Sequence, residues 1–203
     1  MPSCASTSSA TRVDVSAPRA IVIGCSAGGL TALEILLGGL DPRIPSAILV
    51  CCHTGSSDVE LLCELLARHT QLPVAEAAER EAARGGTVHV APSGYHLLVE
   101  HDERFSLSVD PKVNFSRPSI DVLFASAADA YRASLIGIVL TGANQDGARG
   151  LADIRRYGGL SIVQDPADAE VGTMPQAALD IAGADHCIPL VAIAPLLNRL
   201  CLS

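Results

Sequence analysis

Apolar and polar positions along the chain form alternating blocks that predict strands and helices in turn. From Ala20 onward, short apolar runs of strand type are followed by segments whose apolar residues recur at helical spacing. The predicted strands are Ala20–Ile23, Ala47–Cys51, Leu135–Leu140 and Leu160–Gln164, and the predicted helices are about Gly29–Leu37, Asp58–His69, Ser119–Tyr131, Ala148–Tyr157, Pro175–Ala182 and Ala192–Leu200. Ser56 or Ser57 is expected to cap the second helix. This alternation predicts an α/β fold with a parallel sheet and right-handed crossovers.

The middle of the chain has a different pattern. Four short strands are predicted at Val74–Ala77, Thr87–Ala91, His96–Glu100 and Phe105–Val109. The last two form a hairpin, and we expect the whole run to be an antiparallel edge or an insertion flap rather than another βαβ unit. Within it, His89 alternates with apolar residues, so we expect its side chain on the solvent face.

Composition narrows the class of protein. Of the 203 residues 49% are apolar but only 3% are aromatic, so the core must consist of Ala, Val, Leu and Ile, as is usual for parallel sheets covered by helices. The first 19 residues, rich in Ser, Thr and Ala, predict a disordered tail, which leaves residues 20–203 as a single domain. The net charge of −8, without a basic run, argues against nucleic acid and anionic membranes as partners.

The cysteines and the hydropathy pattern indicate the cellular compartment of the protein. The seven cysteines lack the spacing of a disulfide framework, which predicts reduced and mostly buried thiols. No apolar run approaches the roughly 18 residues of a membrane span, and the N-terminus lacks a signal-peptide core. We therefore expect a cytoplasmic protein without membrane insertion.

The stretch Ile21–Gly29 carries the first candidate for chemistry. An apolar strand ends in Gly24-Cys25-Ser26-Ala27-Gly28, and a helical pattern follows at once. The spacing matches G-x-S-x-G, which lifts a serine hydroxyl clear of the sheet edge beside a backbone N–H and a helix N-terminus. The alternative is that Ser26 simply caps the helix.

Polar residues capable of catalysis follow three of the predicted strands. They are Ser26, His53 and Asp146, and parallel strands bring their carboxyl ends to one edge of a sheet. A serine needs a base within reach, and the base needs an anion that fixes its tautomer, so the three residues have the composition of a triad. Taken singly, His53 could be a loop histidine and Asp146 the cap of the helix 148–157. The chain order Ser, His, Asp also argues against an α/β-hydrolase.

Other kinds of site have weaker support. The glycines after the first strand lack the G-x-G-x-x-G spacing and no Walker lysine follows, which leaves a dinucleotide site as a weak alternative. His186 and Cys187 have no second pair at metal-ligand spacing, so a zinc site is not expected. His96 could face the catalytic edge, although a histidine at this place usually has a structural role. No cofactor or metal is therefore expected.

The chain resembles the catalytic domain of the chemotaxis protein-glutamate methylesterases, the CheB family. The resemblance runs from Ala20 to about Leu200 and rests on ordered motifs: Ile-Gly-Cys-Ser-Ala-Gly-Gly at 23–29, Cys52-His53, Gly-Thr-Val-His-Val-Ala-Pro at 86–92, His96, Arg-Pro-Ser-Ile-Asp-Val-Leu-Phe at 117–124, Leu140-Thr141-Gly142, Asp146-Gly147 and Met174-Pro175. It implies a doubly wound, mostly parallel α/β domain with helices on both faces and a small antiparallel flap.

The resemblance also implies roles for residues. Ser26 would be the nucleophile, His53 the base and Asp146 the orienting acid. The residues expected to hold the oxyanion or to line the substrate site are Ala27, Gly28, Thr54, His96, Gly142, Ala143, Asn144 and Met174. The family hydrolyses γ-glutamyl methyl esters on the cytoplasmic helices of chemoreceptors, and some members deamidate receptor glutamines. Methylated chemoreceptor helices are therefore the expected partner.

The sequence departs from the family pattern in loops near the site. His53-Thr54 replaces His-Met, Thr141-Gly142-Ala143-Asn144 replaces Thr-Gly-Met-Gly, and Gly172-Thr173-Met174-Pro175 replaces aromatic-Gly-Met-Pro. The methionine lost at Ala143 lies close to the nucleophile in the family, so we expect a roomier or differently polar site.

Regulation and function stay open at this point. Family members usually carry a receiver domain before the esterase, and 19 residues cannot form one, so we expect no phospho-aspartate control in cis. A separate receiver or adaptor protein is then the alternative source of control. Besides methylesterase activity, two other functions stay open: a non-catalytic receptor-binding scaffold, and a serine hydrolase acting on another ester or amide.

Overall fold

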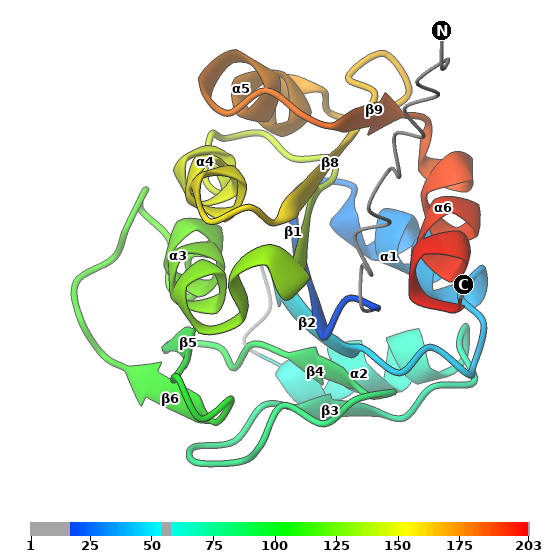
Figure 1. Cartoon of the computed structure of the whole chain (residues 1–203). Helices are drawn as coiled ribbons and strands as arrows, with labels where there is room; N and C mark the ends of the chain where they lie inside the picture. The colour runs from blue at the N-terminus through cyan, green and yellow to red at the C-terminus, as the bar shows by residue number, and fades with distance from the viewer. Residues whose placement is uncertain (1–16, 54–57, 203) are drawn as a thin grey trace, which may run out of the picture.

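A parallel sheet forms the centre of the molecule (Figure 1). The computed structural model describes residues 17–53 and 58–202, and within these ranges the sheet has seven strands. In spatial order they are β3 (Val74–Glu76), β4 (Val88–Val90), β2 (Ala47–Cys52), β1 (Ala20–Cys25), β7 (Leu135–Val139), β8 (Leu160–Gln164) and β9 (His186–Ile188). A separate antiparallel hairpin pairs β5 (His96–Val99) with β6 (Phe105–Ser108). The expected doubly wound, mostly parallel fold with a small antiparallel flap is confirmed.

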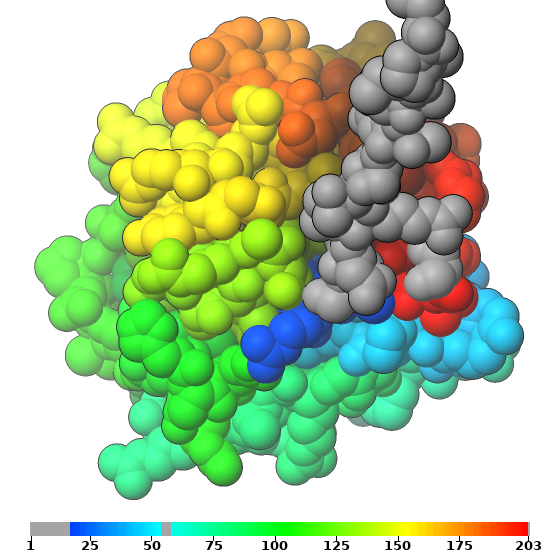
Figure 2. All heavy atoms as spheres, in the orientation of Figure 1, coloured from blue at the N-terminus to red at the C-terminus, as the bar shows by residue number. Residues whose placement is uncertain are grey.

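Helices cover both faces of the sheet. One face carries α1 (Gly29–Gly38), α2 (Val59–Ala67) and α6 (Leu190–Leu202), and the other carries α3 (Ile120–Tyr131), α4 (Ala148–Arg156) and α5 (Thr173–Ile181). Figures 1 and 2 show α3, α4 and α5 side by side. Strand side chains alternate between the faces, so Ile21 and Ile23 pack toward α1 while Val22 packs toward α3. None of the helices in the described ranges is long and apolar enough to cross a membrane.

The chain reverses its course across the sheet at β1. It runs first through β2 and α2 to the edge strand β3 and then to β4, and it later returns to β7 on the other side of β1. From β7 it continues outward to β8 and β9. Loops at the carboxyl ends of strands part at such a switch point, which is where open α/β sheets bind ligands.

The strands β3, β4 and β9 differ from the sequence-based expectation. β4 pairs with β2 and β3 with β4, both in parallel, so these two strands extend the main sheet. The expectation of an antiparallel edge or flap was wrong for them and holds only for β5 and β6. β9 was not predicted at all, because a three-residue strand leaves no periodic signal.

The side chain of His89 is buried, so its expected place on the solvent face was wrong. It is only 1% exposed, and Phe105 of β6 packs edge-on against its ring with 4.9 Å between the ring centroids. His89 Nε2 accepts a hydrogen bond from Arg84 N at 3.1 Å. The β5–β6 hairpin therefore covers the face of β4 that the alternation alone leaves open to water, and this burial lowers the pKa of His89.

The cap of α2 is Asp58 rather than Ser56 or Ser57. The Asp58 carboxylate accepts a hydrogen bond from Leu61 N at 2.9 Å, the usual reach of an N-cap side chain. Ser56 and Ser57 lie outside the described residues.

Helices α3 and α4 pack closely because Gly150 has no side chain. A Cβ atom at position 150 would lie 2.5 Å from Phe124 Cβ and 3.0 Å from Asp121 O. We expect Gly150→Ala to lower the free energy of unfolding by about 1–3 kcal/mol, since overpacking forces the helices apart. Urea denaturation measures the change, and Arg149→Ala, at an exposed neighbouring position, is the control, with an expected change within about 0.5 kcal/mol. Equal stability of wild type and Gly150→Ala would contradict this account of the packing.

Candidate active site

Ser26 and His53 follow two neighbouring strands at the same level. Cys25 and Cys52, the last residues of β1 and β2, are paired in register, and His53 N donates a hydrogen bond to Cys25 O at 3.0 Å. Ser26 N donates to Thr141 O at 3.0 Å, which ties the serine to the loop after β7. Neighbouring strands lie about 4.8 Å apart, so the serine and the histidine emerge side by side at the switch point.

The His53 ring lies between a carboxylate and an amide. Its Nε2 is 3.0 Å from Asp146 Oδ2, and its Nδ1 is 3.3 Å from Asn144 Nδ2. Asn144 Oδ1 in turn accepts a hydrogen bond from Asp146 N at 3.0 Å. The loop after β7 therefore holds the ring from both sides, with Nε2 facing the acid and Nδ1 on the opposite side.

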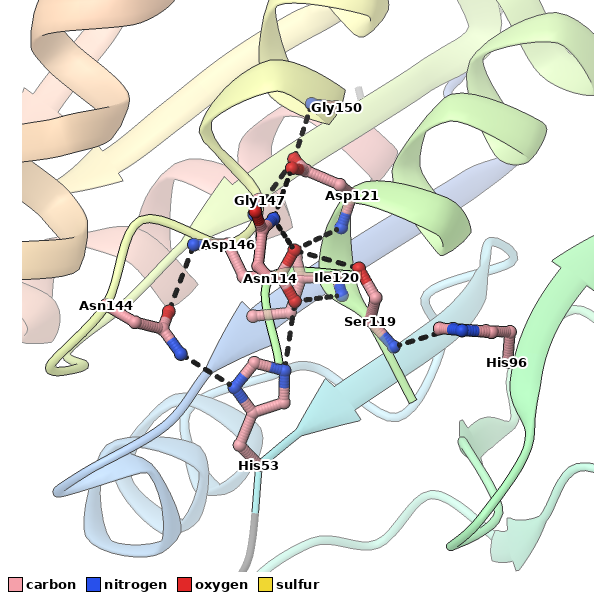
Figure 3. A network of polar contacts seen from close by, with 10 residues as sticks. All are labelled: His53, His96, Asn114, Ser119, Ile120, Asp121, Asn144, Asp146, Gly147 and Gly150. Atoms are coloured by element: carbon pink, nitrogen blue, oxygen red, sulfur yellow. Dashed lines mark hydrogen bonds and ion pairs between the residues drawn. The ribbon is translucent and has the colours of Figure 1, made fainter. Parts of the chain in front are cut away.

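Asp146 is a fully buried carboxylate that receives hydrogen bonds from several donors (Figure 3). Oδ2 accepts from Ile120 N at 2.7 Å, and Oδ1 accepts from Ser119 Oγ and Asn114 Nδ2, both at 2.8 Å, and from Asp121 N at 3.1 Å. Burial raises the pKa of this carboxyl, but the close contact with His53 and the hydrogen bonds from Asn114 and the α3 backbone outweigh burial and hold its pKa below the usual value. Asp146 is thus an anion at neutral pH, at the N-terminus of α3.

Asp121 belongs to α3 but caps α4, whereas Asp146 lies just before α4 but caps α3. Asp121 lies in the first turn of α3, and its Oδ1 accepts hydrogen bonds from Gly147 N at 2.9 Å and Gly150 N at 2.8 Å at the start of α4. Asn114 Nδ2 bridges the two carboxylates, 2.8 Å from each. Burial and the nearby charge of Asp146 raise the pKa of Asp121, so a proton entering this pair goes to Asp121 first. The sequence alone suggested Asp146 as the cap of its own helix, whereas it caps α3.

The turn after Ser26 leads directly into α1. Gly28 is the N-cap residue of α1, with φ +75°, and Ser26 does not cap the helix with its side chain. Gly29 N, the first N–H of α1, donates to Ser26 O at 2.7 Å and closes the turn, and a helix N-terminus of this kind favours an anion. A Cβ atom at position 28 would lie 2.7 Å from Glu170 Oε2, which shows that Glu170 lies against the turn.

The other predicted site residues separate into exposed and buried ones. Ala27 and Ala143 are exposed and Asn144 is half-buried, so these three line the open edge of the site. Gly142 and Met174 are buried against each other, and Gly142 N already donates to Val171 O at 3.0 Å. Thr54 lies outside the described residues.

His96 lies buried behind Asp146 and Ser119 rather than at the open edge of the site. The ring is 1% exposed, Nδ1 accepts from Ser119 N at 3.2 Å, and Nε2 is 3.1 Å from Pro111 O. Both ring nitrogens are thus engaged by backbone groups, which leaves none for a substrate. His96 holds Ser119, and Ser119 holds the Asp146 carboxylate.

Two hollows lie near the site, one bordered by His53 and the other by Asn144, and Phe115 lines both of them. The first, of about 210 Å³, includes Cys52 and His53 together with Lys112, Phe115 and Arg117. The second, of about 330 Å³, lies between Asn114, Phe115, Asn144, Gln145 and Thr173. Within the described ranges, no group of three or more His, Cys, Asp or Glu side chains is arranged to hold a metal ion.

Several residues could not be assigned to the site from the sequence. Ser119 and Asp121 belong to the motif at 117–124, but nothing in it indicated that they contact the acid. Asn114 and Phe115 lie in a loop without periodicity. The contacts of Asn114 depend on the approach of α3 to α4, which only the tertiary fold shows.

Comparison with known proteins agrees with this fold. The sequence matches the family described as CheB methylesterase over residues 21–197. A protein of Leptospira interrogans is 45% identical over 181 residues, which are 89% of this chain and 94% of that protein. A protein-glutamate methylesterase/protein-glutamine glutaminase of Mesorhizobium japonicum is 41% identical over 183 residues, 90% of this chain, although the chain spans only 54% of its length.

A solved structure supports the same assignment. The crystal structure of the CheB methylesterase catalytic domain of Thermotoga maritima matches with a TM-score of 0.86 at 30% identity. The match covers 90% of this chain and 98% of that domain. Sequence and structure therefore lead to one conclusion, that the chain belongs to the CheB methylesterase family.

Proposed function

We propose that this protein is a serine-dependent protein-glutamate methylesterase that acts on methylated chemoreceptor helices. The observation that carries the proposal is the contact of His53 Nε2 with the buried Asp146 carboxylate, 3.0 Å away, at the strand end next to Ser26. Such a set of residues activates a serine for acyl transfer. The relatives named as methylesterases support glutamate methyl esters as the substrate class.

The contacts of His53 support different roles for the two nitrogens of its ring. A neutral imidazole keeps its proton on the nitrogen that faces a carboxylate, here Nε2, and has its lone pair on the other, Nδ1. Nδ1 is therefore the atom that accepts the proton of Ser26 Oγ. Asn144 Nδ2, 3.3 Å from Nδ1, holds the ring plane before the substrate arrives.

The reaction proceeds by acyl transfer in two stages. Ser26 Oγ attacks the γ-carbonyl carbon of the methylated glutamate as its proton moves to His53 Nδ1. The tetrahedral oxyanion lies at the turn of Ala27 and Gly28, where backbone N–H groups at the start of α1 stabilise it. Methanol leaves with the proton from His53, and a water molecule, deprotonated by the same nitrogen, releases glutamate and restores Ser26.

Methanol release from a methylated chemoreceptor cytoplasmic fragment tests the proposal. We expect wild-type protein to release methanol, and the same preparation after treatment with a fluorophosphonate to release none, because the probe blocks the serine hydroxyl. The unmethylated receptor fragment is the control substrate. Ammonia release from receptor glutamines, measured in parallel, tests deamidase activity.

Other outcomes would contradict the proposal in different ways. Tight receptor binding without methanol release or labelling by the probe would indicate a non-catalytic scaffold. Labelling by the probe and turnover of simple methyl esters, but no turnover of the methylated receptor, would indicate a serine hydrolase for another substrate.

A further inference from the structure

The segment between β6 and α3 presents a large apolar side chain to solvent. Phe115 is 96% exposed, the highest value among the large apolar side chains of the described residues. Figure 1 shows this segment as a loop that projects from the body of the molecule, and in Figure 2 it forms the green edge of the surface. A lone exposed Phe is not unusual, so its conformation and its position must decide whether it has a role.

The backbone holds Phe115 in a conformation that aromatic residues avoid. Val113 and Ser116 exchange backbone hydrogen bonds of 3.2 and 2.9 Å, which close a two-residue turn with φ +50° at Asn114 and +65° at Phe115. Turns with positive φ at both central residues favour Asn-Gly, and a bulky residue in the second place is strained. Such strain persists only where the surroundings enforce it, and it is concentrated at ligand-binding and active sites.

The surroundings that enforce this turn belong to the active site. Asn114 Nδ2 donates to Asp146 Oδ1 and to Asp121 Oδ2, both at 2.8 Å, so the residue before Phe115 is fixed to the carboxylate that contacts His53. Phe115 also lines the hollow that His53 borders and the hollow that Asn144 borders. The turn that carries Phe115 is therefore held beside the hollow that borders His53.

We infer that Phe115 is a specificity-determining residue that packs against an apolar side chain of the protein substrate next to the methyl ester. This inference rests on the proposed function. Lys112 and Arg117 line the same hollow as Phe115 and His53, in a chain whose net charge is −8. An apolar ring beside two cationic side chains fits an acidic, amphipathic helix that presents apolar residues beside its glutamates.

Kinetics on two substrates separate substrate docking from chemistry. For Phe115→Ala and Phe115→Gly we expect KM for a methylated receptor fragment to rise about tenfold or more, with kcat changed by no more than about twofold. Hydrolysis of p-nitrophenyl acetate should stay at the wild-type rate, because this ester is too small to reach the ring. The glycine variant relieves the positive φ, so its melting temperature should not fall, which excludes misfolding as the cause. Val191→Ala, at a residue of α6 that is 70% exposed, is the matched control.

Several results would overturn the inference. One is an unchanged KM in both Phe115 variants. A second is an equal loss on receptor and small ester, which would place Phe115 in the catalytic machinery instead. A third is loss of a wild-type dimer in Phe115→Ala with an unchanged KM, which would assign the ring to a contact between two copies of the chain. Wild-type protein that hydrolyses the small ester but releases no methanol from the receptor would refute the proposed function, and this inference with it.

Discussion

Replacing Ser26 by alanine is expected to lower kcat for ester hydrolysis by on the order of 10⁶-fold, the loss seen when a triad nucleophile is removed. Without Oγ no acyl-enzyme forms, and only the polar turn at the start of α1 remains to assist attack by water. KM should change little, because the hydroxyl contributes to the transition state rather than to substrate docking. Single-turnover methanol release from methylated receptor measures the effect.

The fold of the Ser26→Ala variant should be intact. The backbone of Ser26, through its N–H to Thr141 O, joins the turn to the loop after β7, and alanine keeps this bond. A matched control is Ser106→Ala, a half-buried serine of β6 in the hairpin, which should keep wild-type kcat. A kcat for Ser26→Ala within about tenfold of wild type would place the nucleophile elsewhere.

The central strands and the edge that carries Ser26 could be predicted because their signals are local. β1, β2 and β7 are runs of apolar residues covered on both faces, and each is followed by a polar residue of the proposed triad. Parallel strands end at one edge, so the proximity of Ser26, His53 and Asp146 followed from element order without any knowledge of contacts.

What could not be predicted depends on contacts between distant parts of the chain. The burial of His89 requires the β5–β6 hairpin to fold over β4, and the direction of β4 is set by its pairing with β2. The capping of α3 by Asp146 requires α3 and α4 to meet at Gly150. The strained conformation of Phe115 contradicts its local preference, because Asn114 is bound to Asp146 and Asp121.

Asp146 takes part in several of these distant contacts: its carboxylate contacts His53 and also caps α3. Its Oδ2 faces both His53 Nε2 and the first N–H of α3, while its Oδ1 accepts from Asn114, Ser119 and Asp121. An isosteric amide can accept at one atom only. We therefore expect the substitution Asp146→Asn to affect both the proposed catalysis and the stability, with a different pH dependence for each.

Asp146→Asn is expected to lower kcat by about 10⁴-fold, because an amide no longer holds the proton of His53 on Nε2 or stabilises the imidazolium. The free energy of unfolding at neutral pH should fall by about 1–3 kcal/mol, since buried donors of α3 lose their acceptor. Methanol release and urea denaturation measure the two effects. Asp153→Asn on α4, which breaks only the surface ion pair with Arg156 of 3.0 Å, is the control and should change neither by much.

The pH dependence of stability follows from the direction of the pKa shift of Asp146. Its folded pKa lies below the unfolded value, so its contribution is fully present above the unfolded pKa and is lost as the pH falls through the folded pKa. Wild type should therefore lose more stability than Asp146→Asn between neutral pH and about pH 3. The raised pKa of Asp121 has the opposite effect, because protonation of Asp121 favours the folded state as the pH falls. In Asp146→Asn the neighbouring charge is gone, so the pKa of Asp121 should move toward its usual value and the variant's stability should depend less on pH. Parallel acid profiles of the two proteins would contradict a charged Asp146 at the start of α3.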